Sequence, residues 1–122
     1  MARILLAEDD PSLSRILVRW MEGAGYEVAR AGNGLEGFRS ATFGGAPDLL
    51  VTDLMMPESD GEELTGAFDL ALPGRPVLVV TASSDEAMIA RVRACPQVQD
   101  ILHKPVGRET LLAAIEQALG TN

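Results

Sequence analysis

Apolar residues are concentrated in five short runs along the chain, and each run has the length of a β-strand. The runs at 3–7, 48–53 and 77–81 are almost continuously apolar, which is typical of central strands buried on both faces. The run at 26–30 mixes apolar and polar residues, so we expect it at an edge of the sheet. The last run covers residues 98–103.

A segment with helical spacing follows each of these runs. The first begins at Asp10, a residue type that caps helix N-termini, and continues with Pro11, which is favoured in a first turn. One buried stripe is predicted for its apolar positions, which are Leu13, Ile16, Leu17, Trp20 and Met21. The other segments are marked by Leu35, Phe38 and Thr42, by Leu64, Phe68 and Leu72, by Met88, Ile89 and Val92, and by Leu111, Leu112, Ile115 and Leu119. Strands that alternate with helices predict an α/β fold with a parallel sheet covered on both faces.

Length and composition narrow the class of protein. The 122 residues suit a single compact domain over residues 1–122, and 47% of them are apolar. The longest apolar runs are far too short to cross a bilayer, and no signal-peptide pattern precedes the first strand. The formal net charge of −8 argues against a nucleic-acid surface, which needs a basic face. We therefore expect a cytoplasmic protein that contacts neither membranes nor nucleic acids directly.

Reactive polar residues end four of the five predicted strands. Glu8 and Asp9 follow the first strand, while Asp53, Thr81 and Lys104 end the third, fourth and fifth strands. The carboxyl ends of parallel strands lie along one edge of the sheet, where ligands bind in open α/β folds. Carboxylates that converge there repel one another unless a cation lies between them, and Mg²⁺ suits a site with few carboxylates and several waters. The pattern therefore predicts a magnesium site.

The same side chains suit phosphoryl transfer. An aspartate can act as a nucleophile and form an acyl phosphate. A lysine, a hydroxyl and a divalent ion beside it would position the phosphoryl group and neutralise its charge, which is most of what this chemistry requires. Each residue taken singly is more often a cap or a solvated loop residue, so the inference rests on their joint pattern.

The chain resembles the receiver domains of two-component response regulators over almost its whole length, from Arg3 to about Leu119. The matching segments are ILLAEDD, DLLVTDLMMPESDG, VVTA and the dipeptide Lys104-Pro105. The resemblance implies a flavodoxin-like, doubly wound fold, with a five-stranded parallel sheet in the order 2-1-3-4-5 flanked by five helices. It also implies a signalling switch that takes a phosphoryl group from a sensor histidine kinase or a histidine phosphotransfer protein. Such a switch helps to catalyse its own phosphorylation and dephosphorylation without being a turnover enzyme.

The resemblance also implies how the acidic residues divide their roles. Asp53 is expected to accept the phosphoryl group. Asp9, Asp53 and the backbone carbonyl of Met55 are expected to bind Mg²⁺ directly, and Glu8 is expected to help hold the ion through water. Asp10, the third acid after the first strand, is expected to cap the first helix instead.

On the other side of Asp53, the phosphoryl group is expected to contact Lys104, the hydroxyl of Thr81 and the backbone N–H of Ala82. The resemblance further implies a cis peptide bond between Lys104 and Pro105. Several positions depart from the family pattern, and the most consequential is Ile101, which stands where most relatives carry Tyr or Phe. Isoleucine has no rotating ring, so the usual coupling between Thr81 and an aromatic side chain is not carried over.

Two other functions remain open from the residues alone. A small Mg²⁺-dependent phosphatase would also use an aspartyl phosphate, but such enzymes typically carry their nucleophile in a D-x-D motif after the first strand. A binding module that works without phosphorylation is kept open by Ile101. The sequence names neither the cognate kinase nor the downstream target. It also leaves open the oligomeric state and whether the chain is part of a longer protein.

Overall fold

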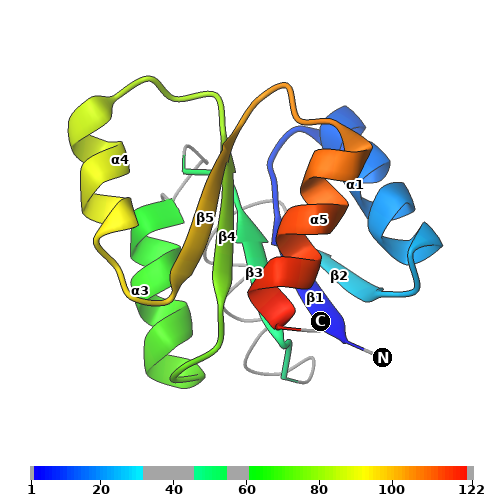
Figure 1. The fold of residues 1–122 in the computed structure, drawn as a ribbon, viewed down its shortest axis with the longest axis horizontal. Coiled ribbons are helices and arrows are strands. Elements are labelled where there is room, and N and C mark those ends of the chain that lie inside the picture. Colours follow the sequence, from blue (N-terminus) through cyan, green and yellow to red (C-terminus); the bar gives the residue numbers. More distant parts are fainter. Residues whose placement is uncertain (1, 32–45, 55–60, 121–122) are drawn as a thin grey trace.

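A five-stranded parallel sheet forms the middle layer of the molecule (Figure 1). The computed structural model describes residues 2–31, 46–54 and 61–120. The strands pair in the order β2-β1-β3-β4-β5, which confirms the order implied by the family resemblance. Their bounds are β1 (Arg3–Ala7), β2 (Glu27–Ala31), β3 (Leu49–Thr52), β4 (Val77–Thr81) and β5 (Val98–His103), each within one residue of the predicted run.

Helices cover both faces of the sheet (Figure 1). In the described residues, α1 (Pro11–Gly23) and α5 (Arg108–Leu119) lie on one face, while α3 (Gly61–Ala71) and α4 (Glu86–Arg93) lie on the other. This arrangement confirms the doubly wound α/β fold. None of these described helices is long and apolar enough to cross a membrane. A further predicted helix lies outside the described residues, and its markers are Leu35, Phe38 and Thr42.

The sheet separates two hydrophobic clusters because successive side chains of a strand point to opposite faces. The cluster beneath α1 and α5 comprises Ile4, Leu6, Leu17, Met21, Leu49, Val51, Leu78, Val80, Leu111 and Ile115. The cluster beneath α3 and α4 comprises Leu5, Ala7, Leu50, Leu54, Leu64, Phe68, Val77, Val79, Val92 and Ile101. Strands β1, β3 and β4 contribute to both clusters, as expected of central strands. Packing on both faces therefore fixes the positions of the strand ends that carry the polar residues.

The start of α1 follows the predicted capping pattern. The Asp10 carboxylate accepts hydrogen bonds from the N–H groups of Ser12 and Leu13, at 2.9 and 3.3 Å. These bonds satisfy two of the backbone donors that a helix N-terminus leaves unpaired. Gly25, two residues after the helix ends, has φ = +98°, a conformation that favours glycine.

One prediction for α1 is wrong. Ile16 was expected in the buried stripe, but 46% of its surface is exposed. The buried face of the helix is formed by Ser14, Leu17 and Met21. Position 16 is rotated by roughly 200° from position 14 at the helical angle of about 100° per residue. The small Ser14 side chain therefore occupies the buried position that the apolar pattern assigned to isoleucine.

Candidate functional site

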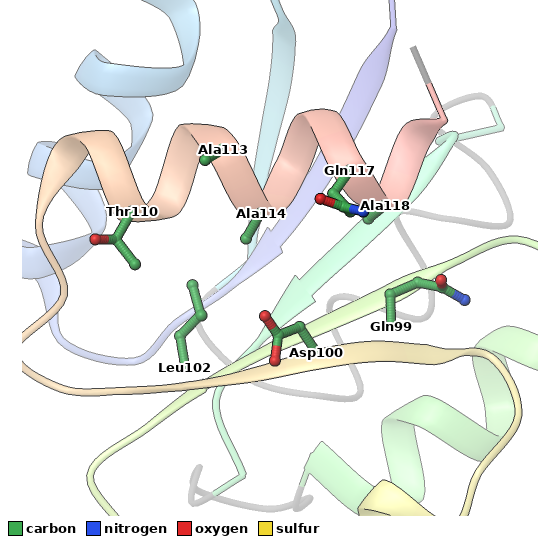
Figure 2. Close-up of a pocket in the computed structure, with 8 residues that line it drawn as sticks. All are labelled: Gln99, Asp100, Leu102, Thr110, Ala113, Ala114, Gln117 and Ala118. Atoms are coloured by element: carbon green, nitrogen blue, oxygen red, sulfur yellow. The ribbon is translucent and has the colours of Figure 1, made fainter. Parts of the chain in front are cut away.

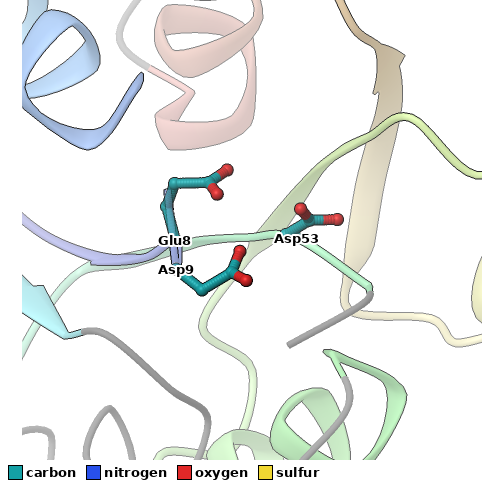
Figure 3. Close-up of side chains that lie close together, drawn as sticks. All are labelled: Glu8, Asp9 and Asp53. Carbon is teal, nitrogen blue, oxygen red and sulfur yellow. The ribbon is translucent and has the colours of Figure 1, made fainter. Parts of the chain in front are cut away.

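Three carboxylates converge at the carboxyl edge of the sheet (Figure 3). Glu8 and Asp9 directly follow β1, and Asp53 follows the neighbouring strand β3. One oxygen from each carboxylate lies within 4.8 Å of the other two. Glu8 and Asp53 are buried, with 4% and 7% of their surfaces exposed, whereas Asp9 is exposed. The acids contributed by the first and third strands thus meet at one place, as the parallel arrangement of the strands predicts.

Backbone contacts hold Asp53 in a fixed orientation. Its N–H donates to the carbonyl of Ala7 at 3.1 Å, so the ends of β3 and β1 are joined directly beneath the carboxylates. The N–H of Leu54 donates to Asp53 Oδ1 at 2.6 Å, and the Thr52 hydroxyl donates to the Asp53 carbonyl at 2.8 Å. The sequence pattern does not predict these contacts, because they depend on the local turn after β3. The one relevant signal in the sequence is that position 54 is not a proline, which would have no N–H to donate to Asp53.

Lys104 completes the site from the end of β5. Its Nζ lies 2.8 Å from Glu8 Oε1 and 2.8 Å from Asp53 Oδ2. The backbone N–H of Lys104 donates to the Thr81 carbonyl at 2.8 Å, and the peptide bond to Pro105 is cis, as predicted. Lys104 is the single lysine of the chain; the other basic residues among its ten Lys and Arg are arginines. An ammonium is a compact point charge, which suits a narrow position between two carboxylates better than a planar guanidinium.

The contact between Lys104 and Glu8 was not predicted. The family resemblance assigns Lys104 to the phosphoryl group and Glu8 to the metal ion. In the structure, Glu8 Oε1 accepts from Lys104 and Glu8 Oε2 accepts from the N–H of Asp10 at 3.0 Å. The convergence of strand ends was a signal for this pairing, but it does not say which carboxylate the ammonium reaches.

Burial and charge shift the pKa values of the two partners. Burial raises the pKa of Glu8 above its usual value, although the hydrogen bonds from Lys104 and the Asp10 N–H oppose this shift. Burial alone would lower the pKa of Lys104. Hydrogen bonds to Asp53 and Glu8, together with their negative charges, outweigh burial and raise the pKa of Lys104 above the usual value. The ammonium is therefore held firmly in its charged form at neutral pH.

The site has a surplus of negative charge that a cation would relieve. Three carboxylates and one ammonium give a formal charge of −3 + 1 = −2 in a partly buried position. All the carboxylate donors are hard oxygen atoms, the ligand type that divalent cations such as Mg²⁺ and Ca²⁺ prefer. The donor set therefore fits a divalent metal ion. The fourth predicted ligand, the carbonyl of Met55, lies outside the described residues.

Thr81 lies at the end of β4, between the strands that carry Asp53 and Lys104, and it is fully buried. Its Oγ1 accepts a hydrogen bond from the N–H of Ser83 at 3.0 Å, so in this conformation the hydroxyl oxygen is bonded to the turn after β4.

Ile101 lies on the neighbouring strand β5, where it pairs with Val79 of β4. Its surface is 6% exposed, and its side chain packs in the cluster beneath α3 and α4. Isoleucine at this position is thus a core residue.

A separate hollow of about 620 Å³ lies between β5 and α5 (Figure 2). Asp100 and Leu102 line it from β5, and Thr110, Ala114 and Gln117 line it from α5. None of the predicted site residues is among its lining residues. The carboxylate cluster and this hollow are therefore distinct features of the molecule.

Comparison with known proteins identifies the family. The sequence model of the response regulator receiver domain matches residues 4–116. The chain is 37% identical over 120 residues to the transcriptional regulatory protein GlrR of Escherichia coli, covering 97% of this chain but 26% of that protein. It is 35% identical over 122 residues to the response regulator receiver protein CpdR of Brucella abortus, and 34% identical over 122 residues to PilH of Pseudomonas aeruginosa. Both alignments cover 98% of each chain. The chain thus spans about a quarter of the transcriptional regulator and nearly all of the two shorter proteins.

Solved structures agree with this assignment. The chemotaxis protein CheY4 of Vibrio cholerae superposes with a TM-score of 0.88 at 27% identity, covering 97% of this chain and 98% of that one. A response regulator receiver domain protein from Clostridium thermocellum gives a TM-score of 0.88 at 26% identity, covering 99% of this chain and 96% of that one. Sequence, strand order and site residues lead to one conclusion: the chain belongs to the response regulator receiver domain family.

Proposed function

We propose that this receiver domain is a phosphorylation switch in which Asp53 accepts a phosphoryl group in a Mg²⁺-dependent reaction. The observation that carries the proposal is the contact between Lys104 Nζ and Asp53 Oδ2, at 2.8 Å, inside a cluster of three carboxylates. This arrangement supplies a nucleophile, a fixed positive charge and a set of metal ligands within one small volume. Phosphoryl transfer needs these parts because it depends chiefly on positioning and charge neutralisation.

The phosphoryl donor in this proposal is a phosphohistidine of a sensor kinase or of a histidine phosphotransfer protein. The P–N bond to the imidazole breaks, a P–O bond to a carboxylate oxygen of Asp53 forms, and the released imidazole nitrogen takes up a proton. The hydrogen bond from Leu54 and the ion pair with Lys104 already orient the Asp53 carboxylate before the donor arrives. Little reorganisation is then needed during transfer, which lowers the barrier.

The proposed metal ligands are Asp9, Asp53 and the carbonyl of Met55. Bound Mg²⁺ would neutralise charge on the phosphoryl oxygens. The exposed Asp9 carboxylate provides the solvent-facing ligand. Both oxygens of Glu8 are already occupied by Lys104 and by the Asp10 N–H, which supports a role for Glu8 in holding the ion indirectly.

Lys104, Thr81 and the N–H of Ala82 are proposed to bind the phosphoryl oxygens once the group is on Asp53. The same contacts would let the domain assist its own phosphorylation and later hydrolysis, without making it a turnover enzyme. The family match favours neither a phosphatase nor a module that works without phosphorylation. The cognate kinase and the target are not identified by any feature of the site.

The proposal is tested by incubating the protein with acetyl phosphate and Mg²⁺ and weighing it by intact-protein mass spectrometry. We expect one added phosphoryl group on the wild-type chain and none on Asp53→Asn. Asp100→Asn is the matched control, because Asp100 is an exposed aspartate on β5 away from the carboxylate cluster. It should be phosphorylated like the wild type. Phosphorylation of Asp53→Asn at the wild-type rate would refute the assignment of the acceptor.

A further inference from the structure

Three arginines line one pocket between α1 and the edge strand β2, which we call the arginine pocket. Arg15 and Arg19 lie on α1, and Arg30 is the penultimate residue of β2. The pocket has a volume of about 480 Å³, and its other lining residues are Val18, Glu22 and Gly23. None of these residues belongs to the carboxylate cluster or to the hollow between β5 and α5. The arginine pocket is therefore a separate feature of the molecule.

The fold explains why the three side chains meet. Residues four positions apart on a helix lie on one face, so Arg15 and Arg19 are neighbours on α1. On β2, Val28 packs in the cluster beneath α1, and Arg30, two residues further on, lies on the same side of the strand. Since α1 connects the parallel neighbours β1 and β2, it runs in the opposite direction to them (Figure 1). The end of β2 is thereby brought beside the face of α1 that carries the other two arginines.

The protein itself does not neutralise the charge of the pocket. In the part of the chain that the structure describes, none of the three guanidinium groups takes part in an ion pair or a hydrogen bond. With three arginines and Glu22, the lining residues have a formal charge of +3 − 1 = +2, in a chain whose net charge is −8. Like charges four residues apart destabilise a helix. The positive charge is thus an unfavourable arrangement for the free protein, and an anion would relieve it.

Phosphate is the anion that the arginine pocket fits best. A guanidinium presents its N–H groups in a planar fork, which binds phosphate through two parallel hydrogen bonds. A volume of about 480 Å³ lies within the range of small-molecule sites, and guanidinium groups from two elements suit two linked phosphates better than a single phosphate ion. A nucleic acid would extend beyond the pocket over an acidic protein, whereas a compact anion meets mainly the local charge, because screening acts over about 8 Å.

We propose that Arg15, Arg19 and Arg30 bind the diphosphate group of a small molecule. The three guanidinium groups hold the phosphate oxygens, and the open side of the pocket leaves room for the rest of the ligand. All three arginines are exposed, so a ligand reaches them without a rearrangement of the core. The inference goes beyond the proposed function and does not depend on it, because no residue of the pocket contacts Asp53 or Lys104 in the described structure.

The test titrates the full chain with ADP and with pyrophosphate and follows the arginine Nε–H signals by ¹H–¹⁵N NMR. The buffer contains EDTA and no Mg²⁺, so that neither the metal site nor phosphorylation of Asp53 contributes. An ionic strength of about 0.15 M screens diffuse attraction. We expect saturable shifts at Arg15, Arg19 and Arg30. No shift is expected at Arg93, which lies on α4 on the other face of the sheet.

Calorimetry on variants measures what each guanidinium contributes. Arg30→Gln should raise the dissociation constant about tenfold or more, the size expected when hydrogen bonds to a charged group are lost. Arg30→Lys keeps the charge but not the planar fork, so it should also weaken binding. Arg93→Gln makes the same change in net charge at an exposed position away from the pocket and should bind like the wild type.

Two results would overturn the proposal. Equal shifts at all arginines, or equal dissociation constants for Arg30→Gln and Arg93→Gln, would show diffuse attraction without a site. Binding of a hexaglutamate peptide, with no binding of ADP or pyrophosphate, would assign the pocket to an acidic protein segment. If the site exists, tighter binding of ADP identifies a nucleotide as the source of the diphosphate, and equal or tighter binding of pyrophosphate identifies the free ion. None of these results changes the role of Asp53.

Discussion

Lys104 determines the electrostatics of the site at the scale of single residues. It lies between two buried carboxylates, and its removal would leave Glu8 and Asp53 facing each other without a compensating charge. Removing one partner of a buried ion pair usually costs more free energy than the intact pair contributes to stability, because the remaining charge stays buried without a partner. A divalent ion would take over part of this neutralisation. The ammonium therefore fills one cation position in the site, and the three carboxylates could hold a second cation.

The raised pKa of Lys104 gives a direct prediction, because the chain contains one lysine. A sample labelled with ¹³C at the lysine ε-carbon shows a single titrating signal, and its midpoint should lie above 10.5, the ordinary value. Since the folded-state pKa is raised, the stabilisation by Lys104 is complete below the unfolded-state pKa and is lost as pH rises through the folded-state pKa.

Glu8→Gln removes one of the two charges that raise the pKa of Lys104, so its midpoint should fall toward the ordinary value. Glu109→Gln, at an exposed position on α5, is the matched control and should leave the midpoint unchanged. A wild-type midpoint at or below 10.5 would show that desolvation outweighs the two carboxylates.

At the scale of secondary-structure elements, the sequence predicted most of what positions the site. The bounds of β1 and β4 follow from apolar runs, and the start of α1 follows from Asp10 and Pro11, because these signals are local. The burial of Ile16 was predicted wrongly because the apolar pattern alone does not show which side of a helix meets the sheet.

The convergence of Glu8, Asp9 and Asp53 could be predicted from strand ends, since parallel topology alone brings them together. The pairing of Lys104 with Glu8 could not. It depends on side-chain directions and distances of a few ångströms, which strand order does not specify.

The cap of α1 can be tested on its own. Asp10→Ala removes the acceptor for the N–H groups of Ser12 and Leu13, and the free energy of unfolding should fall by about 1 kcal/mol. Urea denaturation followed by the fluorescence of Trp20, the single tryptophan, measures the change. Asp10→Asn keeps a side-chain acceptor, so its free energy of unfolding should fall much less. Equal losses in the two variants would mean that the negative charge of Asp10, and not its capping bonds, stabilises the helix.

The whole molecule carries a formal net charge of −8, and part of this charge is concentrated at one edge of the sheet. A cation that binds only the folded state stabilises it by mass action, so folding and metal binding are linked. In the unfolded chain the three carboxylates are not held together. A metal site built from these carboxylates would therefore be a property of the fold, and global stability would report its occupancy.

This linkage gives a prediction for the intact chain. Adding Mg²⁺ to about one hundred times its dissociation constant should raise the free energy of unfolding by about 2.7 kcal/mol. Asp9→Asn removes the exposed carboxylate of the cluster, so the same Mg²⁺ concentration should raise its free energy of unfolding much less. In Asp100→Asn the increase should be as large as in the wild type. If Mg²⁺ stabilised Asp9→Asn as much as the wild type, the ion would have to bind outside the carboxylate cluster.

The most direct test of the account identifies the residue that carries the phosphoryl group. Borohydride reduces an acyl phosphate to an alcohol, so a phosphorylated aspartate becomes homoserine, which peptide mass spectrometry locates. After treatment with acetyl phosphate and Mg²⁺, we predict homoserine at position 53 and nowhere else in the chain. Homoserine at position 9 or at another acidic residue, with none at 53, would contradict the claim that Asp53 is the acceptor.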